Sequence, residues 1–215
     1  MKTSKDKGLL ILSTFVCLLP IALYLIVFDL LPEQMIQQWG ADGTANWTMP
    51  REWAIFVMPL SLALVHIIVF FAINSSSSIN STPPKMRTLF SWFVPVTSVF
   101  TNLLILFANL DESFDVGVAA LIFVGLTFII TGNYLPKTRQ NYFIGVRVPW
   151  TMRCADNWAK THRLSGKLFV ATGIVLVLGS VFLTSESALI VTLLSTITLA
   201  VVIPITYSFA LSRKG

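Results

Sequence analysis

Charged residues are scarce in this sequence. Only 12% of its 215 residues are charged, whereas 55% are hydrophobic and the mean hydropathy is +0.78. Ordinary soluble domains carry about 25% charged residues, so this chain has too little charge to cover a water-exposed surface. The composition excludes an ordinary soluble domain and predicts a compact helical bundle in lipid.

Cysteine and histidine are also few, with two of each. Cys17 lies inside an apolar run and Cys154 in a basic segment, so we expect two reduced thiols and no disulfide between them. The sequence has no metal-ligand spacing, no paired nucleophile and base, and no phosphate-binding glycine loop. We therefore expect no metal, no cofactor, no catalytic residue and no enzymatic activity.

Long apolar runs are abundant, and a helix needs about 20 such residues to cross a bilayer. The runs that qualify are Gly8–Leu31, Ala54–Asn74, Thr88–Asn109, Val116–Tyr134, Leu168–Leu183 and Ala188–Leu211. The first is longer than the core of a secretory signal and has no small-residue cleavage site after it, so we expect it to remain as a span. The fifth is short, and we expect it to gain length from the polar helix before it.

The charges indicate how these runs are oriented. If all of them span, nearly all Lys and Arg residues fall on one side, which should be the cytoplasmic side. The opposite side then holds Glu33, Asp42, Arg51, Glu52, Asp111, Glu112, Asp115 and Glu186. Topology thus explains the net charge of +5 without a basic stripe for nucleic acid, and we expect no direct nucleic-acid binding.

These observations predict an all-α integral membrane bundle of six transmembrane helices, with both termini in the cytoplasm. Residues 1–75 are predicted to form an N-terminal two-helix unit with an outer loop rich in Trp, Gly and Pro. Residues 85–215 are predicted to form a four-helix unit. Its inner loop, residues 132–167, is expected to be long and cytoplasmic, between the fourth and fifth helices.

The outer loop departs from the composition of a lipid span. Pro32 is expected to end the first helix, and Gly40 and Gly43 supply tight turns. Trp39 and Trp47 are expected to hold the loop at the membrane interface. Two interpretations remain open: the loop is a folded cap, or it is a surface that meets an extracellular molecule.

The inner segment is the second departure. Gly145 and Pro149 prevent one continuous helix, and Thr151 is expected to cap a new helix. On that helix Trp158 and His162 are four residues apart and share a face, and we expect it to continue directly into the fifth span. The basic residues here either contact anionic lipid or form a platform for a cytoplasmic partner.

His66 lies near the middle of the second run. A titratable residue at membrane depth is a functional candidate. A proton relay would need a carboxylate or a second histidine at similar depth, and the sequence has neither there. We therefore expect His66 to be hydrogen-bonded between helices.

Together, the two departures resemble a known family. The inner residues resemble the signature of the SdpI family of bacterial membrane proteins, and the outer stretch from Leu31-Pro32 to Trp47 is similar to the small domain of unknown function that forms the family's N-terminal part. The inner residues begin with Gly132-Asn133-Tyr134-Leu135. The candidate partner-binding or motif residues among them are Asn141, Gly145, Arg147, Pro149, Trp150, Thr151, Trp158, Thr161, His162 and Arg163.

The resemblance implies a multi-pass protein of the bacterial cytoplasmic membrane that gives immunity to a secreted peptide toxin. It also implies signal transduction, in which a transcriptional repressor is held at the membrane. The expected partners are therefore the lipid bilayer, an extracellular peptide toxin and a cytoplasmic repressor. The alternative is a small membrane transporter or channel of unknown substrate, which would need polar groups that face one another within the spans.

Overall fold

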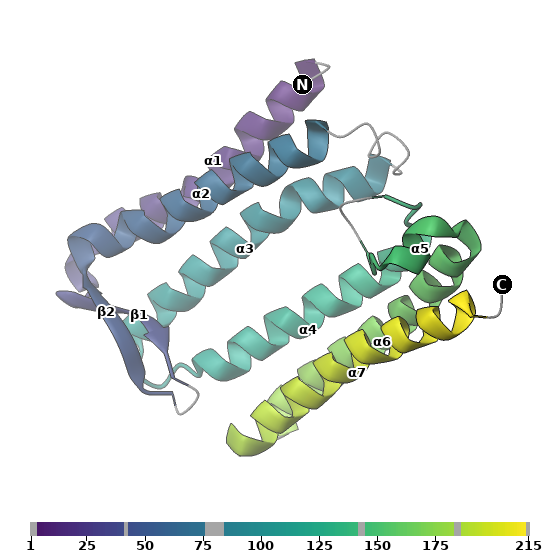
Figure 1. Cartoon of the computed structure of the whole chain (residues 1–215). Helices are drawn as coiled ribbons and strands as arrows, with labels where there is room; N and C mark the ends of the chain where they lie inside the picture. The colour runs from purple at the N-terminus through teal and green to yellow at the C-terminus, as the bar shows by residue number, and fades with distance from the viewer. Residues whose placement is uncertain (1–3, 41–42, 76–83, 142–144, 183–185, 214–215) are drawn as a thin grey trace. The chain divides into compact units, whose positions relative to one another are not determined.

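The computed structural model describes residues 4–40, 43–75, 84–141, 145–182 and 186–213, and Asp42 of the charge analysis lies outside these ranges (Figure 1). Six helices in this part of the chain are long and apolar enough to cross a membrane, which confirms the predicted number of long apolar helices. They are α1 (Ser4–Ile26), α2 (Arg51–Ser75), α3 (Pro84–Leu110), α4 (Val116–Tyr134), α6 (Ala155–Phe182) and α7 (Glu186–Ser212). Three short helical segments accompany them: η1 (Phe28–Leu30), η3 (Leu135–Lys137) and α5 (Pro149–Arg153).

The chain divides into two compact units. Unit 1 comprises Met1–Ser76 and Arg87–Val116, and unit 2 comprises Ser77–Met86 and Gly117–Gly215. Unit 1 thus holds α1, α2 and most of α3, whereas unit 2 holds α4 to α7. The predicted sequence units, residues 1–75 and 85–215, place α3 with the later helices instead, and that division stays a prediction.

The outer loop is a β-hairpin, so the all-α prediction is wrong for this segment. Strands β1 (Gln34–Trp39) and β2 (Ala45–Pro50) pair in antiparallel fashion. Met35 is fully buried and Trp39 is half-buried against the core, whereas Gln38 is exposed. A register irregularity after Ile36 interrupts the alternation, which explains why the sequence shows only a weak strand pattern.

The core of unit 1 lies beneath this hairpin. It draws side chains from α1, α2, α3, β1 and the chain that follows η1. Its buried residues are Tyr24, Leu31, Met35, Ala54, Ile55, Ile105 and Leu106. The hairpin is therefore packed onto the helix ends through an apolar face.

The first helix ends earlier than predicted. α1 stops at Ile26, and η1 turns the chain so that Leu31 enters the core instead of continuing the span. Arg51 holds this turn, because its guanidinium donates to the Leu31 carbonyl oxygen at 2.9 Å and lies 4.6 Å from the centre of the Phe28 ring. Pro32 then restricts the residue before it to an extended conformation, which a helix cannot include.

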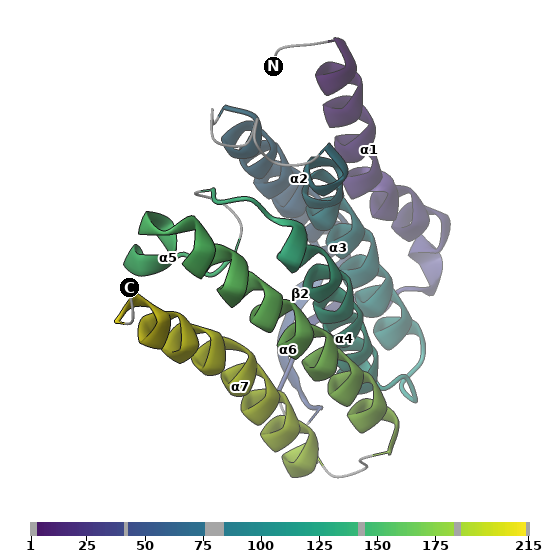
Figure 2. The ribbon, with the colours of Figure 1, turned by 90° about the vertical axis from the view of Figure 1, so that its right-hand side faces the viewer.

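Unit 2 is built on close helix contacts. α6 and α7 lie side by side (Figure 1 and Figure 2). α4 meets α6 through Gly125 and Gly132 on one helix and Gly166 and Gly173 on the other. A Cβ at Gly132 would lie 2.8 Å from the Gly166 carbonyl oxygen, so the backbones touch where no side chain fits.

The inner segment contains the helix that was expected there. α6 begins at Ala155 and continues without interruption to Phe182, so residues 155–167 of the segment are helical. This confirms that the polar helix runs directly into the fifth span. Residues 142–144 of the predicted loop lie outside the described ranges.

Candidate functional site

Thr151 organises the turn at the start of α5, within the inner segment. The N-cap of α5 is Val148, with Pro149 at the first helical position, so the prediction that Thr151 is the cap is wrong. Thr151 is the third helical residue. Its buried hydroxyl accepts the Val148 N–H at 3.1 Å and donates to the Val146 carbonyl oxygen at 2.8 Å. The Thr hydroxyl therefore closes the turn from within, as a capping-box residue does.

His162 lies at the centre of the buried part of the segment. Its ring stacks on Trp158 with 4.0 Å between ring centroids, which confirms that the two residues share a helix face. Its Nε2 accepts the Val146 N–H at 3.1 Å, and its Nδ1 lies 2.8 Å from the Trp158 carbonyl oxygen. A main-chain N–H only donates and a carbonyl only accepts, so the proton must be on Nδ1 and the ring is neutral.

Gly145 lets the loop pass directly over this histidine. Its φ is +115°, a conformation that side-chain-bearing residues rarely adopt. A Cβ at this position would also overlap His162 Nε2. Two independent constraints thus require glycine here.

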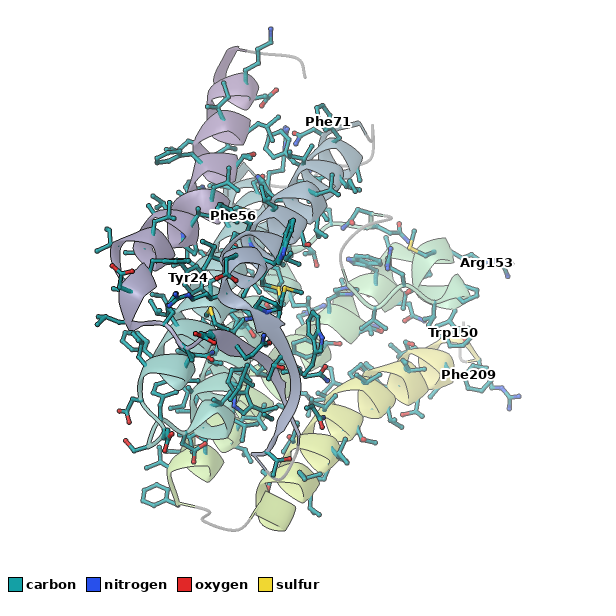
Figure 3. The ribbon with its side chains drawn as sticks, turned by 90° about the vertical axis from the view of Figure 1, so that its left-hand side faces the viewer. Tyr24, Phe56, Phe71, Trp150, Arg153 and Phe209 are labelled. Carbon is teal, nitrogen blue, oxygen red and sulfur yellow. The ribbon has the colours of Figure 1, made fainter. Side chains whose placement is uncertain are left out.

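Two tryptophans tie the segment to its neighbours. Trp150 donates from Nε1 to the Ser208 hydroxyl of α7 at 2.6 Å, and its ring faces Phe209 at 5.2 Å (Figure 3). Trp158 donates to the Thr138 carbonyl oxygen beside η3 at 2.9 Å. Loop, η3, α6 and α7 are therefore joined by directional bonds as well as by packing.

Sequence reasoning missed several members of this network. Asn157 donates to the Ser208 carbonyl oxygen at 2.9 Å and accepts the Thr161 hydroxyl at 3.0 Å. Gln140 donates to the Thr151 carbonyl oxygen at 2.7 Å. Ser208 gave no signal, because it lies near the end of the last apolar run, far from the inner segment in the sequence.

Burial separates the candidate inner residues into two sets. Asn141, Thr151, Trp158, Thr161 and His162 are at most 2% exposed and form the inner polar cluster. Gly145 and Trp150 are half-buried, whereas Arg147, Pro149 and Arg163 are exposed. A partner that approached this segment would meet the second set.

Several basic residues of the inner segment are exposed. They are Lys137, Arg139, Arg147, Arg153, Arg163 and Lys167. Lys160 is also exposed, but it pairs with Asp156 of the preceding helical turn at 2.7 Å. The inner segment thus combines exposed cations with the buried, neutral, hydrogen-bonded side chains of the inner polar cluster.

On the outer hairpin, the side chain of Asn109 from α3 forms hydrogen bonds to the edge of β1, as a neighbouring strand would. Its Oδ1 accepts the Ile36 N–H at 2.7 Å, and its Nδ2 donates to the Ile36 carbonyl oxygen at 2.9 Å. One side chain therefore satisfies both backbone groups of Ile36 on the edge of β1 that faces away from β2. The sequence offered only a polar residue at the end of an apolar run.

The predicted outer residues occupy different environments. Gly43 has a φ of +74°, and the Gly40 N–H donates to the Thr44 carbonyl oxygen at 2.8 Å, so both contribute to the turn region between the strands. Pro32 is exposed. Trp39 packs against the core, whereas Trp47 on β2 is 48% exposed.

Polar side chains inside the spans of unit 1 bond to one another. The Ser13 hydroxyl lies 2.8 Å from His66 Nε2, which confirms that this histidine is hydrogen-bonded between helices. The Tyr24 hydroxyl donates to the Asn102 side-chain Oδ1 at 3.3 Å and to the Asn102 main-chain carbonyl oxygen at 2.8 Å. These groups serve helix–helix contacts. Both cysteines are free, as expected.

Two family models match separate parts of the chain. Residues 137–208, which include the inner polar cluster, match the SdpI/YfhL protein family. Residues 15–63, from α1 through the hairpin to α2, match a domain of unknown function (DUF1648). The immunity protein SdpI of Bacillus subtilis (strain 168) is 26% identical over 206 residues, covering 95% of this chain and 96% of that protein. No solved structure matches.

Proposed function

Since this chain is a multi-pass membrane protein of the SdpI family, we propose that it gives immunity to a secreted peptide toxin at the bacterial cytoplasmic membrane. The observation that carries this proposal is the likeness to the immunity protein SdpI, which covers 95% of this chain and 96% of that protein. The likeness extends over both units and thus includes the outer hairpin and the inner segment. We propose binding of the toxin, not catalysis, as the protective step.

In this proposal both termini and the inner segment are cytoplasmic. The support comes from the charges: the exposed Lys and Arg of the inner segment gather at one end of their spans, as the positive-inside rule requires. Arg51 is the exception, but its guanidinium is used to bind the Leu31 carbonyl oxygen and the Phe28 ring. It therefore stabilises a turn and adds little weight against the orientation.

The orientation has a direct test in the chain's own cysteines, because Cys154 is exposed on the inner segment and Cys17 is buried. A membrane-impermeant maleimide should label Cys154 in inside-out vesicles and leave it unlabelled in intact cells. A Thr48→Cys variant in the Cys154→Ser background should show the reverse pattern, since Thr48 is exposed on β2. Labelling of Cys154 in intact cells would refute the orientation.

The outer hairpin is the surface proposed to meet the toxin. Trp47 of β2 and Trp53 of α2 are 48% and 66% exposed, and Asn109 fixes the neighbouring strand β1 to α3. Exposed tryptophans on a rigid support bind amphipathic peptides well, because little conformational freedom is lost on binding. The same residues would also anchor the hairpin at the membrane interface.

The exposed cations of the inner segment are the surface proposed to hold a transcriptional repressor at the membrane. Arg147, Arg153 and Arg163 are exposed, whereas the inner polar cluster beneath them is buried. The buried residues would thus shape the segment, and the arginines would make the contacts. Arginine suits such contacts because its planar guanidinium binds carboxylates in two places at once.

Survival of a toxin-sensitive bacterium tests these roles separately. Cells that express the wild-type protein should survive challenge with a sporulation-delaying-type peptide toxin. At equal membrane levels, Trp47→Ala should reduce survival, whereas a double Arg147→Gln, Arg163→Gln variant should protect fully. The double variant should instead release the repressor from the membrane fraction. Full protection by Trp47→Ala would show that the Trp47 side chain is not needed for toxin binding.

A further inference from the structure

A groove of about 400 Å³ lies on unit 2, between the end of α4 with η3 and the middle of α6. Its floor includes Gly132 and Gly166, which are buried, and its rim includes the exposed Asn133 and Lys167. A Cβ at Gly166 would lie 2.7 Å from the Gly132 carbonyl oxygen. The groove therefore exists because two glycines bring the helices to backbone contact while the neighbouring side chains stay apart.

The groove changes from polar to apolar along its length. Lys167 and Asn133 mark the end nearest the inner segment, and Val170, Ala171 and Ile174 follow along α6. Lys167 and Ile174 are seven residues apart, or about 10 Å along a helix. The lining thus offers a cation and an amide at one end and about one helical turn of hydrocarbon contact, from Val170 to Ile174, beyond them.

The charges nearby favour an anion at the polar end. Arg163 precedes Lys167 by four residues and so lies on the same face of α6. Lys137 of η3 is also exposed, and its ammonium lies 4.9 Å from the centre of the Tyr134 ring. Basic pockets between membrane helices on the cytoplasmic side are suited to anionic lipid headgroups.

We propose that this groove binds one anionic phospholipid, with its phosphate at Lys167 and Asn133 and one acyl chain along Val170 and Ile174. A free anion would use only the polar end, and a neutral hydrocarbon would gain nothing from Lys167. An amphiphile with a negative headgroup satisfies both ends of the groove. This inference does not depend on the immunity function.

Such a lipid would link α4 to α6 next to the inner polar cluster. Ser165 of α6 immediately precedes Gly166 of the groove, and its hydroxyl donates to the Thr161 carbonyl oxygen at 2.9 Å. The lipid headgroup would therefore stabilise the helix turn that carries the cluster. Protein stability should accordingly respond to anionic lipid more strongly than to zwitterionic lipid.

The test is native mass spectrometry of the purified full-length protein with phosphatidylglycerol or phosphatidylcholine of identical acyl chains. The wild type should retain one phosphatidylglycerol more tightly than phosphatidylcholine. Lys167→Gln should weaken phosphatidylglycerol binding about fivefold, the effect of roughly one interfacial lysine. It should weaken phosphatidylcholine binding less, because the choline ammonium offsets the charge of the phosphate in that lipid. Ala171→Phe, which fills the apolar part from an exposed position, should weaken both lipids.

Lys160→Gln is the matched control, because Lys160 lies on the same helix but pairs with Asp156 and does not line the groove. It should bind both lipids as the wild type does. Equal losses for Lys160→Gln and Lys167→Gln would show diffuse surface charge and overturn the proposal. Equal wild-type affinity for the two lipids would overturn it too, as would equally effective competition by inorganic phosphate.

Discussion

Replacing Gly145 with alanine should strongly destabilise unit 2. The backbone there has a φ of +115°, and holding a residue with a side chain in such a conformation costs about 1–3 kcal/mol. The new Cβ would also overlap His162 Nε2, so the loop must move and the Val146 N–H loses its acceptor. An unpaired buried N–H costs about 1–3 kcal/mol, and this partly buried one should lie at the low end, so we expect a total loss of about 2–4 kcal/mol.

Thermal unfolding of the purified protein in detergent micelles measures this loss, with near-UV circular dichroism as the signal. Gly8→Ala is the control, since a Cβ at Gly8 would meet nothing within 4 Å and alanine is the better helix former. That control should unfold at the wild-type temperature or slightly above it. If Gly145→Ala unfolded together with Gly8→Ala, the proposed contact between the loop and the histidine would be wrong.

Three other substitutions test separate contacts by the same unfolding measurement. Asn109→Ala should cost about 1–3 kcal/mol and make the hairpin more sensitive to protease, because both main-chain groups of Ile36 lose their partner, whereas the exposed Asn46→Ala should change little. Trp150→Phe should cost about 0.5–1.5 kcal/mol, because it retains the aromatic contact with α7 and loses the indole hydrogen bond; no loss would contradict that bond. Ser13→Ala should cost about 0.6 kcal/mol and at most about 1.7 kcal/mol, the average and the maximum for hydrogen bonds between membrane helices, and wild-type stability would show that the serine contact with His66 contributes nothing.

The spans could be predicted from the sequence because bilayer thickness imposes a length that apolar runs reveal directly. The continuous helix α6 was also predictable. Trp158 and His162 are spaced as on one face of a helix, and this polar helix leads directly into the fifth apolar run. The early end of α1 was not, because Phe28 and Leu31 are as apolar as the residues before them. The tertiary contact with Arg51, which holds the turn, is not visible in that local pattern.

The hairpin and the buried network depend on partners far away in the sequence. Asn109 is 73 residues from Ile36, and Trp150 is 58 residues from Ser208. No local pattern records such pairings, so the residue types of the inner motif were visible while their arrangement was not. The sequence also gave no sign that His162 and Thr151 are buried whereas Arg147 and Arg163 are exposed.

The immunity proposal is tested most directly by toxin dose–survival curves for sensitive cells with the wild-type protein, an empty vector or Gly145→Ala. Membrane levels of the two proteins must be matched by quantitative immunoblotting. We predict that the wild type shifts the lethal dose upward relative to the vector and that Gly145→Ala loses part of this shift. Identical curves for wild type and vector, with the protein present in the membrane, would contradict immunity to that toxin.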